Sequence, residues 1–192
     1  MRLFVALDLP DDVRRALGDL IARLRPECRG ARWVRADGMH LTLKFIGETN
    51  SDKLDSIRGA LAAVQSDQPV EMHFRGLGFF PHERRPRVIW CGVEASPNLA
   101  GLAGDVDRAL TPLGISAETR EFIPHLTLAR FNSHEGLDKI VRAADDLRSY
   151  DFGSARNTEF HLYESFLKPS GAEYKRLATF PIVKSTSTKG SP

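Results

Sequence analysis

The chain has 192 residues, of which 42% are hydrophobic, and carries a formal net charge of +2. Its length allows a substantial core, and its mild charge argues against a protein dedicated to duplex DNA. No apolar run approaches the ~20 residues of a membrane span, and the first one is too short for a secretion signal, so we expect a cytoplasmic protein without a membrane partner. Cys28 and Cys91 have neither a disulfide-framework nor a zinc-site spacing.

Apolar periodicity predicts four helices and seven strands. Apolar residues in steps of three and four indicate amphipathic helices, and short apolar or alternating runs indicate strands. In chain order, the pattern predicts strand 2–7, helix 13–24, strand 39–46, helix 54–64, strands 69–78 and 87–94, helix 99–110, strand 123–131, helix 137–147, and strands 158–167 and 176–183. A proline or a capping residue stands near the head of each helix, as is usual for helix starts.

The order of these elements repeats after about ninety residues, which is typical of a duplicated lobe and too long for a solenoid. Strand, helix, strand, helix, strand runs from 2 to 78 and again from 87 to 167. We therefore expect an α+β fold in which residues 1–183 form a single bilobal domain. Two antiparallel-rich sheets should face a central groove, with the helices packed on the outside. The polar residues 184–192 should form a disordered tail.

The tetrapeptide His-Leu-Thr-Leu occurs twice, at positions 40–43 and 125–128, each time inside a strand-like run. Successive side chains of a strand point to opposite faces, so His40 and Thr42 share one face, roughly 6.5–7 Å apart. The leucines point the other way and anchor the strand in the helical layer. Two such half-sites, one from each lobe, are expected to face one groove.

Two imidazoles acting on one substrate can serve as the base and the acid of a proton-transfer reaction. The ordinary pKa of histidine, ~6.5, suits this task near neutral pH. The hydroxyls of Thr42 and Thr127 can donate hydrogen bonds to anionic oxygens. This set fits a phosphodiester: one of His40 and His125 takes a proton from the attacking water, and the other gives one to the departing oxygen.

Two other interpretations apply to these histidines. A single histidine in a strand is usually structural, but two copies at matching places favour a shared site. Metal binding is disfavoured because no second ligand stands at His-x-His or His-x₃-His spacing and threonine is a poor ligand. We therefore expect no metal.

The residues around both tetrapeptides carry a wider resemblance. The chain resembles the two-histidine (2H) phosphoesterase superfamily and, more narrowly, the RNA 2′,3′-cyclic phosphodiesterases, also known as 2′-5′ RNA ligase-like proteins. The matching segments are the opening strand (2–6) and the two extended motifs (39–48 and 124–130). The middle hairpin matches at 78–81 and 85–90, and the closing hairpin matches at 162–165 and Tyr174. The resemblance covers residues 1 to about 183.

The resemblance implies a bilobal enzyme that hydrolyses a 2′,3′-cyclic phosphate to a 2′-phosphomonoester without a cofactor. It further implies that His40 is the proton donor to the leaving 3′-oxygen and that His125 is the proton acceptor that activates water. The motifs are identical, so their sequences alone do not order these two roles. Thr42 and Thr127 carry over as donors to the phosphate oxygens.

Three further residues are candidates for substrate contacts. Arg130 is a candidate phosphate ligand, although strict alternation from His125 points it to the other face unless a bulge or the strand end intervenes. Phe45 is a candidate for stacking a base, although its parity with the motif's leucines favours the core. Trp33 fits either a stacking platform or ordinary packing, and packing is favoured.

The expected partner is RNA with a 2′,3′-cyclic phosphate end, or a small cyclic nucleotide, bound by a monomer. One alternative is a 2′-5′ RNA ligase-like or other cyclic-nucleotide phosphodiesterase activity. Another is a non-catalytic module that binds RNA or a nucleotide. The presence of the histidine and the threonine in both copies counts against the second alternative.

Overall fold

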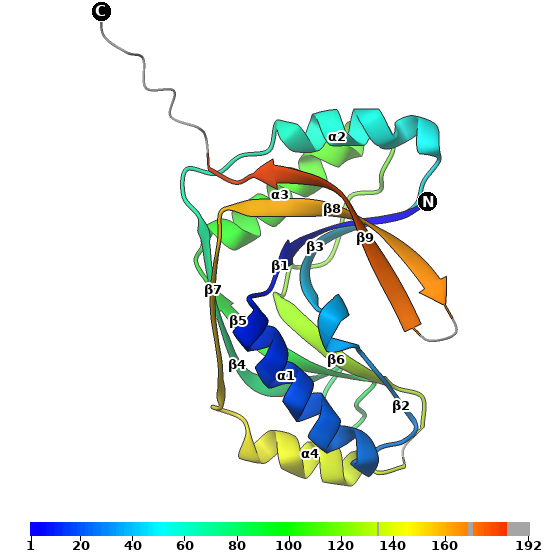
Figure 1. Cartoon of the computed structure of the whole chain (residues 1–192), viewed down its shortest axis with the longest axis vertical. Coiled ribbons are helices and arrows are strands. Elements are labelled where there is room, and N and C mark those ends of the chain that lie inside the picture. The colour runs from blue at the N-terminus through cyan, green and yellow to red at the C-terminus, as the bar shows by residue number, and fades with distance from the viewer. Residues whose placement is uncertain (134, 169–170, 184–192) are drawn as a thin grey trace, which may run out of the picture.

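The computed structural model describes residues 1–133, 135–168 and 171–183 (Figure 1). The tail expected over 184–192 lies outside the described residues. Within them, the four predicted helices are α1 (Asp11–Leu24), α2 (Leu54–Ala62), α3 (Asn98–Leu110) and α4 (Leu137–Asp146). The strands of the described chain are β1 (Arg2–Asp8), β2 (Ala31–Trp33), β3 (His40–Glu48), β4 (Val70–Phe80), β5 (Val88–Ala95), β6 (His125–Phe131), β7 (Asp151–Asn157), β8 (Glu159–Lys168) and β9 (Gly171–Pro181).

Each of the seven predicted strands overlaps an observed one, whereas β2 and β7 were not expected from the sequence. Strand β2 has only three residues, too few for a periodic signal. Strand β7 reads Asp-Phe-Gly-Ser-Ala-Arg-Asn, in which small and polar residues hide the apolar alternation. Both lie at sheet edges, where one side of the strand has no neighbour to constrain its composition.

The strands form two sheets in which every ladder is antiparallel. One sheet, called sheet A, has the order β3-β1-β8-β9, and the other, sheet B, has the order β2-β6-β5-β4-β7. The order β3-β1-β8-β9 in sheet A corresponds to β6-β5-β4-β7 in sheet B, so the repeat is visible in space. Two antiparallel sheets with four helices in the described chain confirm the predicted α+β fold.

The two sheets do not coincide with the two halves of the sequence. Strand β4 closes the first half but pairs with β5, and β8 closes the second half but pairs with β1. Each sheet therefore takes strands from both halves of the sequence. Both halves have the same pattern, so periodicity cannot tell whether a closing strand pairs within its own half or with the other half.

The helices cover one face of each sheet, with α2 and α3 over sheet A and α1 and α4 over sheet B (Figure 1). Leu3, Val5 and Leu7 of β1 enter the main core, which continues through both sheets and all four of these helices. Phe4 and Ala6 point to the other face of sheet A and form a second, small cluster. In the described part of the chain, no helix combines the length and the apolar character of a membrane span.

Candidate active site

The repeated tetrapeptides open strands β3 and β6, one in each sheet (Figure 1). Their leucines are between 0% and 6% exposed and belong to the main core: Leu41, Leu43, Leu126 and Leu128. The histidine and the threonine of each copy are half-buried on the opposite face. The predicted division into anchoring leucines and outward-facing polar residues is confirmed, and the histidine-bearing faces are those not covered by helices.

A β-bulge in β3 changes which side chains share the His40 face. Thr42 and Lys44 pair with consecutive residues of β1, which leaves Leu43 as the extra residue. An extra residue reverses the alternation beyond it. Phe45 therefore lies on the same face as His40 and is 67% exposed. The parity argument that favours a core position for Phe45 is wrong, because Lys44 takes that position.

The same bulge recurs in β6. Thr127 and Ala129 pair with consecutive residues of β5, which leaves Leu128 as the extra residue. Arg130 is exposed and shares the face of His125 and Thr127. Strict alternation points Arg130 to the other face, and the bulge reverses that placement. Each motif thus presents a histidine, a threonine and a third side chain three residues after the threonine.

Lys44, displaced into the core by the bulge, joins β3 to the segment that leads into β6. Its Nζ lies 2.5 Å from Asp107 Oδ1 on α3 and donates a hydrogen bond of 2.7 Å to the carbonyl of Ser116. Asp107 also accepts the backbone N–H of Glu118, at 3.1 Å. The ion pair therefore links the first motif to the loop that precedes the second one.

The ring of His125 has a defined hydrogen bond. Its Nδ1 lies 2.8 Å from the carbonyl oxygen of Ile123. A carbonyl oxygen only accepts, so Nδ1 carries the proton and Nε2 of the neutral ring carries a free lone pair. Phe80 packs edge-on against the imidazole, with the ring centroids 4.9 Å apart. This tautomer is the one that a proton acceptor at Nε2 requires.

The ring of His40 is enclosed by aromatic side chains. Phe4 stacks on it with the centroids 4.5 Å apart, and Tyr174 meets it edge-on at 4.9 Å. Burial lowers the pKa of His40 to about 4, against the opposing effects of a hydrogen bond to the Gly38 backbone and of the charge on Asp8. Without a ligand, His40 is neutral at pH 7.

A polar network centred on Asp8, which the sequence did not predict, lies next to His40. Asp8 is the cross-strand partner of His40 and accepts a hydrogen bond of 2.6 Å from the hydroxyl of Tyr163. Arg176 donates to both Asp8 and Tyr163, and the buried His161 has its Nε2 3.6 Å from the same carboxylate. Burial and the bond to Asp8 raise the pKa of Tyr163 to about 12. One feature of the sequence points to this network: the acidic residue Asp8 directly follows a continuously apolar strand.

Each threonine has a defined partner on the neighbouring strand of its sheet. Thr42 is opposite Ala6 in β1, and Thr127 is opposite Trp90 in β5. The Trp90 ring in turn lies over Gly78, where an added Cβ would come within 2.2 Å of the indole. Glycine at this position therefore lets the tryptophan lie close to the sheet beside Thr127.

Metal ligands and reactive thiols are not gathered at these faces. Among the residues that the structure describes, no group of three or more His, Cys, Asp or Glu side chains is arranged to hold a metal ion. Cys28 and Cys91 are free and buried. Burial raises the pKa of Cys91 to about 12, so it stays a thiol and acts as a small core residue.

Comparison with known proteins places these features in a family. The model of the LigT like Phosphoesterase family matches residues 7–90 and 92–174. A protein from Archaeoglobus fulgidus named RNA 2′,3′-cyclic phosphodiesterase is 36% identical over 183 residues, covering 94% of this chain and 99% of that protein. A similarly named Thermotoga maritima protein is 33% identical, covering 92% and 93%.

Solved structures agree with this assignment. The crystal structure of TT0787 of Thermus thermophilus matches with a TM-score of 0.78 and 31% identity, covering 95% of this chain and 98% of that one. The crystal structure of E. coli LigT complexed with 3′-AMP matches with a TM-score of 0.77 and 28% identity, with the same coverage. With its duplicated sheets and paired His-x-Thr strands, the chain belongs to the LigT-like 2H phosphoesterases, a family of enzymes.

Proposed function

We propose that this enzyme hydrolyses the 2′,3′-cyclic phosphate at the end of an RNA strand or of a small nucleotide, and that it uses His40 and His125 without a metal. One observation carries the proposal: equivalent bulges give both sheets the same half-site on the face that helices leave uncovered. The names of the Archaeoglobus fulgidus and Thermotoga maritima relatives supply the substrate class.

The two histidines divide the proton transfers. His125 removes a proton from water through Nε2, and the water oxygen forms a bond to phosphorus. The bond from phosphorus to the 3′-oxygen breaks, and His40 gives that oxygen its proton. The product carries a 2′-phosphomonoester and a free 3′-hydroxyl. One proton has moved to His125 and one has left His40, so exchange with solvent restores the starting state.

The remaining side chains of the half-sites offset the negative charge. The hydroxyls of Thr42 and Thr127 donate to the two non-bridging oxygens, one from each sheet. Arg130 supplies a positive charge on the His125 side, where the attacking water brings a further oxygen to phosphorus. Phe45, at the equivalent position of the other sheet, offers an exposed ring on which the base can stack.

The donor role of His40 depends on the substrate. In the ligand-free protein its low pKa keeps it neutral at pH 7, because burial disfavours the charged ring. A bound phosphate places a negative charge beside the imidazole and favours its protonated form. Substrate binding and proton uptake by His40 are therefore coupled.

The direct test is incubation of the purified enzyme with 2′,3′-cyclic nucleotides and a cyclic-ended oligonucleotide, with the product identified by phosphorus NMR. We expect a 2′-phosphate. A 3′-phosphate would contradict the assigned leaving oxygen. Binding of a 2′-phosphorylated nucleotide without turnover would favour the binding module, and joining of the cyclic end to an added 5′-hydroxyl strand would favour a ligase-like enzyme.

A further inference from the structure

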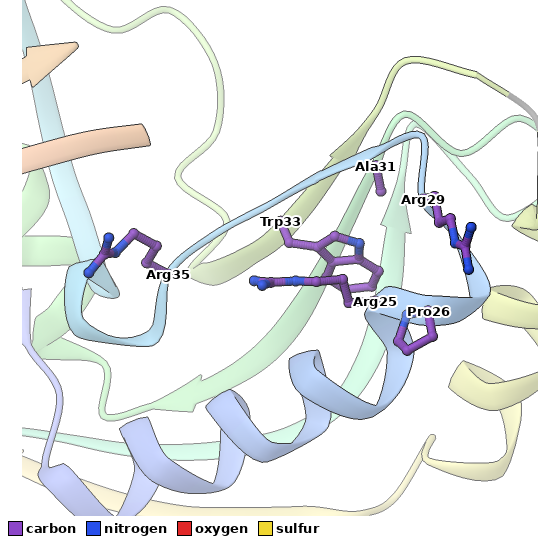
Figure 2. A pocket seen from close by; sticks show the side chains of 6 residues that line it. All are labelled: Arg25, Pro26, Arg29, Ala31, Trp33 and Arg35. Atoms are coloured by element: carbon purple, nitrogen blue, oxygen red, sulfur yellow. The ribbon is translucent and has the colours of Figure 1, made fainter. Parts of the chain in front are cut away.

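A basic cavity lies beside strand β2, apart from the two histidines. It is an open hollow of about 850 Å³, lined by Arg25, Pro26, Arg29, Ala31, Trp33 and Arg35. Figure 2 shows the indole of Trp33 in the middle of the cavity, with Arg25 beside it and Arg29 and Arg35 toward its two ends. The volume lies within the range of about 300–1,000 Å³ that is usual for ligand pockets.

Positive charge is concentrated along this segment. Residues 25–35 carry four arginines and one acidic residue, Glu27, although the whole chain has a formal net charge of only +2. Glu27 accepts a hydrogen bond of 2.8 Å from Lys139 on α4, so its charge is already balanced. Arg35 is paired with Asp37. Within the described chain, no carboxylate lies within 4 Å of the guanidinium of Arg25 or Arg29, so both are available to an anion.

Arg32 connects this cavity with the catalytic face. Arg32 and Arg130 are direct partners in the ladder between β2 and β6, so their side chains project from the same face of sheet B. Ala31 and Trp33 project from the opposite face, toward the cavity. Strand β2 lies at the edge of sheet B, so a ligand can pass from one face of the sheet to the other by crossing this single strand.

An aromatic ring flanked by unpaired arginines is typical of sites that bind single-stranded nucleic acid. Any base can stack on an indole, and guanidinium groups pair with the phosphates on either side. A buried apolar ligand is a poor match, because Arg25 and Arg29 are exposed at the cavity. A chain that leaves the catalytic site past Arg130 meets Arg32 next.

We propose that this cavity is a subsite for the RNA upstream of the cyclic end. The strand passes from the catalytic face over Arg32, turns around the free edge of β2, stacks one base on Trp33 and pairs its phosphates with Arg25 and Arg29. The subsite rests on the proposed function and deepens it, because it makes oligonucleotide RNA a better substrate than a free cyclic nucleotide.

The test compares two double charge reversals. Arg25→Glu with Arg29→Glu alters the cavity, and Arg15→Glu with Arg156→Glu makes the same change of net charge at exposed positions on α1 and on β7, the far edge of sheet B. The readout is kcat/KM for a 2′,3′-cyclic mononucleotide and for cyclic-ended oligonucleotides of increasing length, measured over a range of salt concentrations.

The cavity variant should lower kcat/KM for the oligonucleotides by about tenfold or more and leave the mononucleotide unchanged. It should also reduce the slope of log KM against log salt by about 1.4, since each lost contact with a single strand removes about 0.7. The control variant should retain the wild-type preference for length. Trp33→Phe keeps a ring to stack on and should retain most of this preference, whereas Trp33→Leu should lose it.

Equal kcat/KM of the wild type for mononucleotide and oligonucleotide would overturn the subsite, as would equal losses in the cavity and control variants. Failure of the proposed function is separate, because the wild type would then leave the mononucleotide intact. In that case, fluorescence anisotropy with a labelled 2′-phosphate-ended oligonucleotide still measures binding at the subsite. Tighter binding by the wild type than by the cavity variant supports it, and equal binding contradicts it.

Discussion

Occupation of the phosphate site should raise the pKa of His40 from about 4 toward 7. The perturbation is the binding of a 2′-phosphorylated nucleotide, the product of the proposed reaction. The sign follows from the charges, because a nearby anion stabilises the protonated imidazole and therefore raises its pKa. A proton donor for the leaving oxygen at neutral pH requires this shift.

The magnitude is within the reach of one phosphate charge. A rise of three pKa units corresponds to about 4 kcal/mol, at about 1.4 kcal/mol per unit. Two unit charges about 4 Å apart interact by about 4 kcal/mol at an effective dielectric constant near 20. The aromatic enclosure by Phe4 and Tyr174, which disfavours the charged ring of the free enzyme, also limits screening of this attraction by water.

The assay is a pH titration of the His40 ring by NMR, with and without the ligand, assigned by comparison with His40→Gln. Calorimetry in two buffers of different ionisation enthalpy should show net proton uptake on binding near pH 6. His161 is an internal control: burial lowers its pKa too, but it lies behind Asp8, so its titration should move much less. A His40 pKa that stays below about 5 in the complex would refute the donor role and favour the opposite assignment.

Four other predictions address the half-sites, the linking ion pair and the metal. Arg130→Ala should lower kcat/KM for a cyclic nucleotide about a hundredfold, as for other groups that stabilise a developing charge. Phe45→Ala should raise KM about tenfold with an unchanged Tm, since stacking contributes about 1–3 kcal/mol per base; wild-type kinetics in either variant would remove that residue from the site. Lys44→Ala should lower the free energy of unfolding in urea by about 3 kcal/mol, because Asp107 loses its buried partner, and Lys44→Met with Asp107→Leu should recover most of it. An equal loss in the double variant would contradict this account. Activity should persist in excess EDTA, and a loss restored by zinc or manganese would contradict the metal-free mechanism.

The sequence predicts the parts of this fold that depend on periodicity. Apolar spacing predicts the four helices, and seven strands are predictable because their buried faces are continuous or alternating. The pairing of β4 with β5 and of β8 with β1 depends on which of two equivalent partners a strand chooses. Local pattern contains no information on that choice.

The half-sites show a similar limit. Parity correctly separated the histidine and threonine of each motif from the leucines, because it holds within four residues of regular strand. It failed beyond the threonine, where Leu43 and Leu128 are bulged and the next residues change face. The apolar Leu128-Ala129 pair is buried throughout. No sequence feature of such a pair indicates a bulge. In the first motif, a lysine after Leu43 does not suggest a buried position, although Lys44 is buried.

Long-range polar contacts were beyond the sequence for another reason. Asp8 and Arg176 meet because β1 pairs with β8 and β8 with β9, a pairing that joins the two ends of the described chain. The cavity at β2 likewise depends on a three-residue strand that docks on β6. The composition of residues 25–35 was visible, but the side chains that face one another depend on the fold.

The central claim is that His40 and His125 act together on one cyclic phosphate, and the most direct test is the turnover of His40→Ala and His125→Ala. Each variant should hydrolyse a 2′,3′-cyclic nucleotide at least about a hundredfold more slowly than the wild type, the lower range for losing a general acid or base. Circular dichroism and Tm establish that the variants are folded. A near-wild-type kcat in either folded variant would contradict the two-histidine mechanism.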